Sequence, residues 1–225
     1  GAEDGMALEK ALPNNTVIVC CPCFDVLRQE HKGKPPTFYC TSDGHLVVER
    51  LNKEKQDCVD LLDLLDKAGF ATWSRPTMTA VCWGRQLFQT FYATGALSGM
   101  TQAEQLSDSY HRVIYAQMIH EGTVALKKAS KGNKWKPDSS GFSVFSVEQI
   151  EMILHLPTLL FWALLGWTGF GYKFEAKCPS PLTQDLNARL KTDVGDINRK
   201  IVSVAEQYNC KAPVNKMVAQ LVRLV

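Results

Sequence analysis

The chain has 225 residues, of which 45% are hydrophobic and 21% are charged. This length suffices for one large domain or two small ones, and the composition excludes a mainly disordered or collagen-like chain. Lys and Arg number 25 against 23 Asp and Glu, for a net charge of +2. A nucleic acid or other polyanion is therefore not expected as a partner.

The cysteine content and the start of the chain bear on the compartment. Eight cysteines in this length are too dilute for a small disulfide scaffold. The opening GAEDGMALEK lacks the charged head and apolar stretch of a signal peptide. We therefore expect a reducing, cytoplasmic environment.

Three segments near the start have the pattern of strands. Residues 16–21 are rich in β-branched side chains, residues 37–41 follow two prolines, and residues 45–49 follow the turn-forming pair Asp43 and Gly44. From residue 55 the apolar period becomes helical, and Gly69 can end that helix in a left-handed conformation. A short extended piece, residues 71–76, follows.

Beyond Thr77 the pattern is helical throughout. The apolar residues predict helices over residues 78–97, 103–130, 147–165, 192–208 and 214–221, with Thr192 as an N-cap. The second of these has an apolar stripe of Leu106, Tyr110, Val113, Ile114, Met118 and Val124. The polar loop over residues 131–141 is expected to be exposed and mobile.

These patterns predict an α+β fold that is mostly α. Residues 1–75 form a partial α/β sheet of Rossmann type, and residues 76–225 form an all-helical domain. So small a sheet, with two open edges, is marginal unless something covers it. We infer missing neighbouring strands, supplied by an upstream segment of the natural chain or by a partner.

A cysteine cluster invites comparison with a zinc site. Cys20 and Cys23 form a C-x-x-C pair, with His31 and Cys40 close in sequence. No second C-x-x-C follows, and cysteines that continue a strand commonly behave as small buried hydrophobes. We therefore expect no metal site.

A long apolar run covers residues 152–172, interrupted only by His155 and broken by Pro157 and several glycines. It reaches the length of a membrane span, but breakers at both ends favour a core or subunit contact, and hence possible homodimerisation. The sequence contains neither a Gly-rich nucleotide loop nor a P-loop motif. His111 and His120 fall within a predicted helix, where structural roles are expected.

Several short motifs, in order, resemble the ketopantoate reductase family over nearly the whole chain. They are residues 1–5, residues 83–97 beginning Trp-Gly-Arg, residues 106–128 with Arg112, Glu121 and Gly122, residues 156–161, residues 180–185, residues 192–198 and residues 212–215. The resemblance implies an N-terminal Rossmann domain that holds NADP and a helical domain of the 6-phosphogluconate dehydrogenase C-terminal type. A small 2-keto acid would bind between the two domains, and this chain would lack the pyrophosphate-binding part of the first one.

By the same resemblance, Arg85 takes the place of the family's catalytic lysine. Gln89 matches a substrate-binding asparagine, Ser180 would hydrogen-bond the keto acid, and Asp193 would contact the cofactor. Arg85 could clamp a carboxylate, but a guanidinium keeps its proton at ordinary pH, which makes it a poor general acid. The next asparagine falls on Tyr92 or its neighbour, and Pro181 replaces a serine.

Two functions remain open from the sequence. The first is the C-terminal portion of an NADP-dependent 2-keto acid reductase with altered or degraded catalytic positions, in which water replaces the lysine as proton source. The second is a non-catalytic relative whose helical domain self-associates through the apolar segment at residues 156–167. Neither function involves nucleic acid or a membrane.

Overall fold

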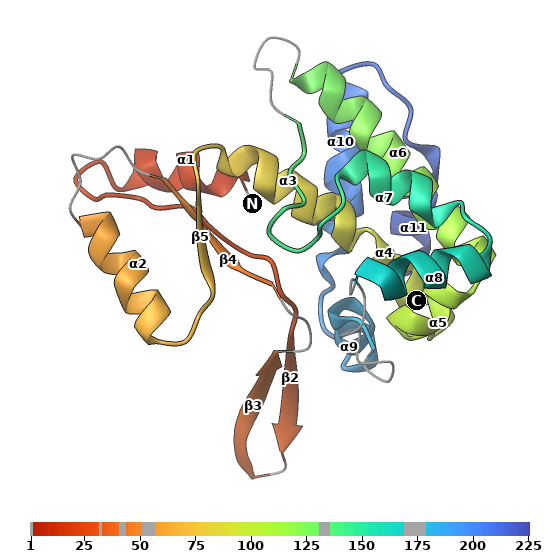
Figure 1. The fold of residues 1–225 in the computed structure, drawn as a ribbon, viewed down its shortest axis with the longest axis horizontal. Helices are drawn as coiled ribbons and strands as arrows, with labels where there is room; N and C mark the ends of the chain where they lie inside the picture. Colours follow the sequence, from red (N-terminus) through yellow and green to blue (C-terminus); the bar gives the residue numbers. More distant parts are fainter. Residues whose placement is uncertain (1, 32, 41–43, 51–56, 131–135, 169–178) are drawn as a thin grey trace.

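The computed structural model describes residues 2–31, 33–40, 44–50, 57–130, 136–168 and 179–225. Figure 1 shows a small sheet beside α1 (Ala2–Ala11) and α2 (Asp57–Lys67), and a larger group of helices at the other end of the molecule. Helix α3 (Met78–Gln89) contacts both α1 and the sheet, and it packs on the long helix α6 (Ser109–Ala129). The predicted fold class, mostly α with a partial sheet and a helical C-terminal part, is confirmed.

The sheet has three short strands in the order β1–β4–β5, with bounds Cys20–Pro22, Leu46–Glu49 and Thr72–Arg75. β1 and β4 are antiparallel, with Cys21 opposite Val47, and β4 and β5 are parallel, with Val47 opposite Trp73. The prediction of a strand over residues 45–49 is therefore confirmed. Within residues 16–21, only the last two form ladder pairs, so that strand was predicted too long.

The prediction that residues 37–41 belong to the same sheet is wrong. The strand β3 (Lys34–Cys40) pairs instead with β2 (Val26–His31) in a separate hairpin, which projects away from the body of the molecule in Figure 1. Gly33, near the turn, has φ of 73°, a conformation that favours glycine. β2 was missed because its sequence, VLRQEH, is mostly polar and lacks the alternation of a half-buried strand.

The helical part comprises α3 and eight further α-helices among the described residues, with one short 3₁₀ turn. Their bounds are α4 Phe91–Ser98, α5 Gln102–Ser107, α6 Ser109–Ala129, α7 Val147–Leu154, α8 Thr158–Thr168, α9 Pro181–Asn187, η1 Asp193–Gly195, α10 Asn198–Gln207 and α11 Pro213–Val222. Helices α1 and α9 were not predicted. Thr192 makes no side-chain cap, because the 3₁₀ turn η1 stands where the predicted helix would begin.

Three helices predicted as continuous are each broken in two. At Thr90 the hydroxyl donates to the Leu87 carbonyl oxygen (2.7 Å) and the backbone N–H bonds to the same oxygen, which tightens the turn between α3 and α4. Asp108 is extended and caps α6 by accepting from the Tyr110 N–H (3.1 Å). Pro157, which disfavours helix at the residue before it, separates α7 from α8.

The buried face of α6 also differs from the predicted stripe. Tyr110 is 80% exposed, and Val113, Ile114 and Val124 are exposed as well, whereas Leu106 and Met118 of the stripe are buried. The true buried face contains Arg112, Tyr115, Ala116, Ile119, Glu121, Gly122 and Leu126. Two charged residues and a glycine on that face weaken its hydrophobic signal, so the sequence favoured the wrong side.

The structure explains two residues of the family-like motifs on α6, Glu121 and Gly122. Glu121 accepts hydrogen bonds from the backbone N–H groups of Val214 (2.9 Å) and Asn215 (3.0 Å), and so caps the N-terminus of α11 with a negative charge. At Gly122 an added Cβ would lie 2.2 Å from a methyl carbon of Leu87. A larger residue at this position would therefore force the buried Leu87 side chain to move, so the α3–α6 contact favours glycine here.

The loop predicted over residues 131–141 is packed where the structure describes it, from residue 136 on. Ser139 is buried, and the Asp138 N–H donates to the Ala80 carbonyl oxygen of α3 (2.9 Å). A Cβ on Gly84 would lie 2.0 Å from the Asp138 carbonyl oxygen. The expectation of an exposed loop is thus wrong for this part, because its backbone lies directly against α3. Residues 131–135 lie outside the described residues.

The apolar run falls on α7 and α8, with residues 169–172 outside the described residues. Phe161 and Leu165 of α8 are buried, whereas Leu159 is 83% exposed and Leu160 is exposed too. In the described part of the chain, no helix combines the length and the apolar character needed to cross a bilayer. Each of the two helix histidines is paired with a carboxylate, His111 with Asp108 and His120 with Glu151, and the structural roles expected for them stay a prediction.

Candidate functional site

A cleft of about 440 Å³ lies between the sheet and the helical part. One wall comes from the chain around β1, a second from α3, and a third from the segment that runs from η1 into α10. The lining residues are Val19, Cys20, Cys21, Pro22, Cys82, Arg85, Gln86, Gln89, Asp193, Asp196, Ile197 and Lys200. Three of the four predicted site residues, Arg85, Gln89 and Asp193, therefore meet in one cleft.

Arg85 lies on α3 and is only 6% exposed. Its Nη2 donates to the Asp25 carboxylate, in a buried ion pair, and also to the Phe24 carbonyl oxygen (3.3 Å). The Tyr92 hydroxyl donates to the same carboxylate (2.6 Å). The Arg85 guanidinium thus already holds a carboxylate, and that carboxylate belongs to the chain itself.

The charges of this group are fixed by its surroundings. Burial by itself lowers the pKa of the Arg85 guanidinium, but Tyr92 and Asp25 outweigh it, and the pKa lies above its ordinary value. Burial raises the pKa of the Tyr92 hydroxyl above its usual range. Neither Arg85 nor Tyr92 gives up a proton near neutral pH. The Arg85 Nε is buried and has no hydrogen-bond partner among the residues that the structure describes.

Gln86 connects α3 to the third wall of the cleft. Its side-chain nitrogen donates to the Asp196 carbonyl oxygen (2.9 Å) and to the Ile197 carbonyl oxygen (3.1 Å). These bonds fix the turn that carries Asp193, which is exposed, opposite Gln89 on the next turn of α3. Sequence reasoning missed Gln86 because no motif marks a helical glutamine that bonds to a distant backbone.

Ser180 does not line the cleft. It is buried as the N-cap of α9, where its hydroxyl accepts from the Thr183 N–H (3.2 Å), pairs with the Thr183 hydroxyl (2.8 Å) and donates to the Tyr92 carbonyl oxygen (3.4 Å). The hydroxyl that was predicted to bind a keto acid is engaged in capping a helix. A serine immediately before a proline is itself a signature of such a cap.

Two further kinds of cleft residue were not predicted for this site. Lys200, at the start of α10, brings an amine to the wall, and Cys20, Cys21 and Cys82 bring thiols. The zinc grouping considered from the sequence is not assembled: among the described residues, no cluster of three or more His, Cys, Asp or Glu could hold a metal ion. His31 instead hydrogen-bonds Thr37 within the hairpin (3.0 Å).

Comparison with known families gives one match, to the family described as "Ketopantoate reductase PanE/ApbA C terminal", over residues 78–225. The match covers α3 and everything after it, including the helix that carries Arg85 and Gln89. No protein in the curated collection matches the sequence.

Solved structures share the fold at low sequence identity. A complex of D-mandelate dehydrogenase with NADH has a TM-score of 0.70 at 16% identity, with all of this chain and 66% of that chain covered. A PanE/ApbA family ketopantoate reductase from Ralstonia eutropha JMP134 has a TM-score of 0.66 at 16% identity, covering 100% of this chain and 63% of that one. A dimeric ketopantoate reductase from Staphylococcus aureus has a TM-score of 0.63 at 14% identity, covering 96% and 63%. The present chain therefore spans about two thirds of the length of these structures.

Proposed function

This chain belongs to the ketopantoate reductase PanE/ApbA family, and from that premise we propose that it is the C-terminal portion of an NADP-dependent oxidoreductase that acts on a 2-keto acid and has degraded catalytic positions. Residues 1–75 are the distal part of a dinucleotide-binding domain, and residues 76–225 are the helical substrate domain. The observation that supports this assignment is the cleft that gathers Arg85, Gln89 and Asp193. We place the protein in a reducing compartment, the cytoplasm.

Binding of a keto acid follows from the charges in the cleft. A guanidinium can bind a carboxylate through parallel hydrogen bonds, and Arg85 already holds the Asp25 carboxylate through a single contact from Nη2. A substrate carboxylate would replace the Asp25 carboxylate on Arg85, and Gln89 would donate to the keto oxygen. Affinity should therefore be weak, because each binding event must break a buried internal ion pair. Ser180 would contribute only if it released the cap of α9.

Reduction of a ketone requires a group that supplies a proton as charge develops on the carbonyl oxygen. Arg85 and Tyr92 both hold their protons too strongly for this step. The amine of Lys200 lies in the cleft wall, and we assign it, or water, the role that a lysine at position 85 would otherwise have. Turnover should accordingly be slow.

The described residues of this cleft include no Gly-rich turn of the kind that binds a cofactor's pyrophosphate. None of the lining residues is a glycine, so the walls offer no Gly-rich backbone turn for a pyrophosphate. The NADP cofactor, whose reduced form NADPH would supply the hydride when bound, would be held only once an N-terminal dinucleotide-binding domain completes the cleft. From this chain, Asp193 would face the cofactor.

The test uses the full-length polypeptide, with whatever sequence precedes Gly1 in its gene. NADPH oxidation is followed by absorbance across a panel of 2-keto acids that includes ketopantoate. We expect slow oxidation with at least one acid, and its loss in Lys200→Gln identifies the amine as proton source. NADPH binding without any oxidation across the panel would reject the reductase and favour the alternative below.

The alternative is a non-catalytic relative that serves as a helical binding or dimerisation module. It is favoured by the apolar side chains that α8 and α6 expose, among them Leu159, Leu160 and Tyr110. Light scattering tests the module: a dimer that dissociates in Leu159→Lys, in a protein that binds NADPH without oxidising it, supports a module built on α8. A strict monomer at high concentration contradicts it.

A further inference from the structure

Three thiols from two parts of the chain meet beside the cleft. Cys21 and Cys23, at β1 and just after it, are buried in a small apolar cluster with Val47, and Cys82 of α3 packs against the same cluster. The Cys21 side chain is hydrogen-bonded to the side chains of both Cys23 and Cys82. All three cysteines are free.

The thiols differ in their access to the cleft. Cys21 and Cys82 line it, and Cys82 is the less buried of the two. Cys23 is 1% exposed and lies under Gly141, where an added Cβ would be only 2.6 Å from the Cys23 sulfur. A small oxidant that enters the cleft therefore meets the thiols of Cys20, Cys82 and Cys21, but not that of Cys23, and of these three Cys20 is the most exposed.

Backbone geometry favours one pair over the other. Cys21 and Cys23 are two residues apart in extended chain, so their Cα atoms are separated by about 6.6 Å, near the upper limit for a disulfide. Their backbone is held: Cys21 pairs with Val47, and the Cys23 N–H donates to the His45 carbonyl oxygen (2.9 Å). Cys21 and Cys82 lie on β1 and α3, which pack on each other, and their side chains share a hydrogen bond at the edge of one apolar cluster.

We propose that Cys21 and Cys82 form a reversible dithiol–disulfide pair in the wall of the cleft, oxidised by a low-molecular-weight disulfide such as glutathione disulfide. The Cys82 thiolate attacks one sulfur of the oxidant and releases one glutathione thiol, which leaves a mixed disulfide on Cys82. The Cys21 thiolate then attacks the Cys82 sulfur and releases the second glutathione thiol. The protein loses two hydrogens, and the oxidant gains them.

The third cysteine makes a thiolate available to this pair. The hydrogen bond from Cys21 lowers the pKa of the Cys23 thiol, and nearby Arg85 lowers it further, while Glu49 and Asp138 are the facing carboxylates that oppose a negative charge on these sulfurs. The same contact raises the pKa of Cys21 to about 12, and the hydrogen bond to Cys21 together with burial raises the pKa of Cys82 well above its ordinary value. Cys82 must therefore pass its proton through Cys21 to the Cys23 thiolate as it attacks, so oxidation should be slow near neutral pH.

A Cys21–Cys82 disulfide would affect the cleft that contains Arg85. Cys82 precedes Arg85 by three residues, so both lie on the same face of α3. A Cys21–Cys82 disulfide would fix β1 against that face and hold the cleft at one width. Only this regulatory consequence rests on the proposed function; the existence of the thiol pair does not.

The test treats the reduced full-length chain with glutathione disulfide, alkylates the remaining thiols and maps disulfide-linked peptides by mass spectrometry. We expect a Cys21–Cys82 link that forms without retained glutathione and is reversed by dithiothreitol. The link should be lost in Cys21→Ala and in Cys82→Ala, unchanged in Cys40→Ala, which alters an exposed hairpin cysteine, and slower to form in Cys23→Ala.

Mapping the disulfide-linked peptides of the wild-type protein needs neither substrate nor turnover. Its result is therefore independent of whether the protein reduces a keto acid. A link between Cys21 and Cys23, stable glutathione adducts at Cys82, or full alkylation of Cys21 and Cys82 after oxidation would each overturn the proposal. Circular dichroism of each variant separates a lost link from a lost fold.

Discussion

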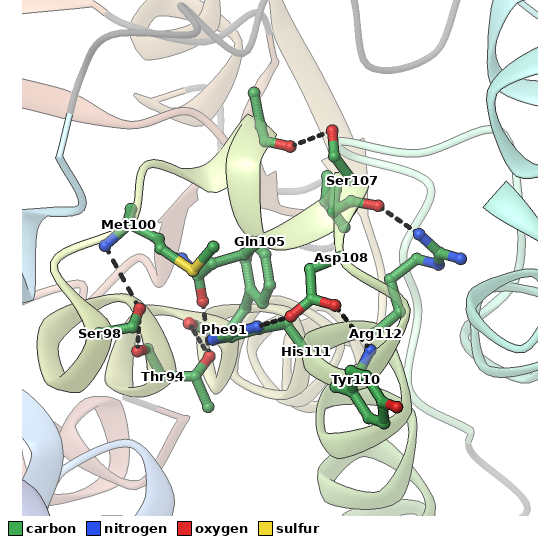
Figure 2. Close-up of polar contacts among 12 residues, drawn as sticks. Phe91, Thr94, Ser98, Met100, Gln105, Ser107, Asp108, Tyr110, His111 and Arg112 are labelled. Atoms are coloured by element: carbon green, nitrogen blue, oxygen red, sulfur yellow. Dashed lines mark hydrogen bonds and ion pairs between the residues drawn. The ribbon is translucent and has the colours of Figure 1, made fainter.

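Two buried arginines, one in the helical part and one in the cleft wall, are satisfied in opposite ways. Arg112 bonds only to neutral oxygens: the carbonyls of Leu106 (2.7 Å), Leu154 (3.3 Å) and Leu156 (3.0 Å) and the Thr158 hydroxyl (3.1 Å), and its guanidinium lies 4.7 Å from the Phe161 ring centroid. Figure 2 shows this side chain reaching out from α6 beside the Asp108 cap. Arg85 instead pairs with a carboxylate that is distant in sequence.

The difference separates a structural arginine from one available for function. Arg112 binds backbone carbonyls near the ends of α5 and α7, where a cation is favoured and where no ligand could replace the backbone. The carboxylate on Arg85 is a side chain, and another carboxylate could take its place. A buried ion pair adds little to stability compared with an apolar pair of similar volume, but removal of one partner is costly. This contrast can be tested by substitution.

The largest effect is expected for Arg112→Met. The variant leaves several buried carbonyl oxygens without donors, and at roughly 1 to 3 kcal/mol for each orphaned group the total loss should be about 4 kcal/mol. Urea unfolding measures it. Arg223→Met, at the exposed residue that follows α11, is the control and should change stability by less than about 0.5 kcal/mol. Equal losses in the two variants would contradict a structural role for Arg112.

The next effect concerns the ion pair. Asp25→Leu leaves the Arg85 charge buried and unpaired and should cost about 3 kcal/mol of unfolding free energy. The double variant Asp25→Leu with Arg85→Met should recover most of this loss, because no charge remains buried and the remaining cost is that of the Tyr92 hydroxyl without its acceptor. A double-mutant cycle by urea unfolding tests this. Losses that simply add would show that the two side chains act independently.

A smaller change in stability, about 1 kcal/mol, is expected for Arg85→Lys, which keeps the charge but loses the planar fork. The rate of the reaction should increase instead. An ammonium can give up a proton, so the rate of NADPH oxidation by the full-length polypeptide with its preferred keto acid should rise. Arg85→Met is the matched control and should show no gain. If Arg85→Lys also shows none, the keto oxygen does not lie near position 85.

The smallest effect is expected at the exposed cap beside Arg112. The hydrogen bond with His111, followed by the bond from the Tyr110 N–H, holds the pKa of Asp108 below its usual value. Its contribution to stability is therefore complete above the unfolded pKa of about 3.9 and is lost as pH falls through the lower folded value. Below about pH 4, the free energy of unfolding of the wild type should fall more steeply with decreasing pH than that of Asp108→Asn, which keeps a capping group. Parallel pH profiles would contradict this.

Local sequence signals predicted much of the helical part. Gly69 was assigned a left-handed cap, and its φ is 89°. Ile201 was assigned to a buried face and is buried, whereas Leu61, assigned to a similar face of α2, is only partly buried. The difference follows from packing: Ile201 lies in the large helical core, while α2 contacts chiefly β5. Periodicity reveals that a helix has an apolar face, but not how much of the protein covers it.

For the site, the family-like motifs identified Arg85, Gln89 and Asp193, while Asp25 and the contact between Cys21 and Cys82 carried no signal. Residue type, spacing and breakers act within a few residues, so the sequence by itself determined most of the helical segments, the left-handed end at Gly69 and the change from strands to helices near residue 76. Which carboxylate neutralises Arg85, and which thiols touch, depends on chain segments some 60 residues apart. Only the packing of β1 and the start of the hairpin against α3 decided those contacts, because a pairwise interaction across that separation exists only once both surfaces are folded.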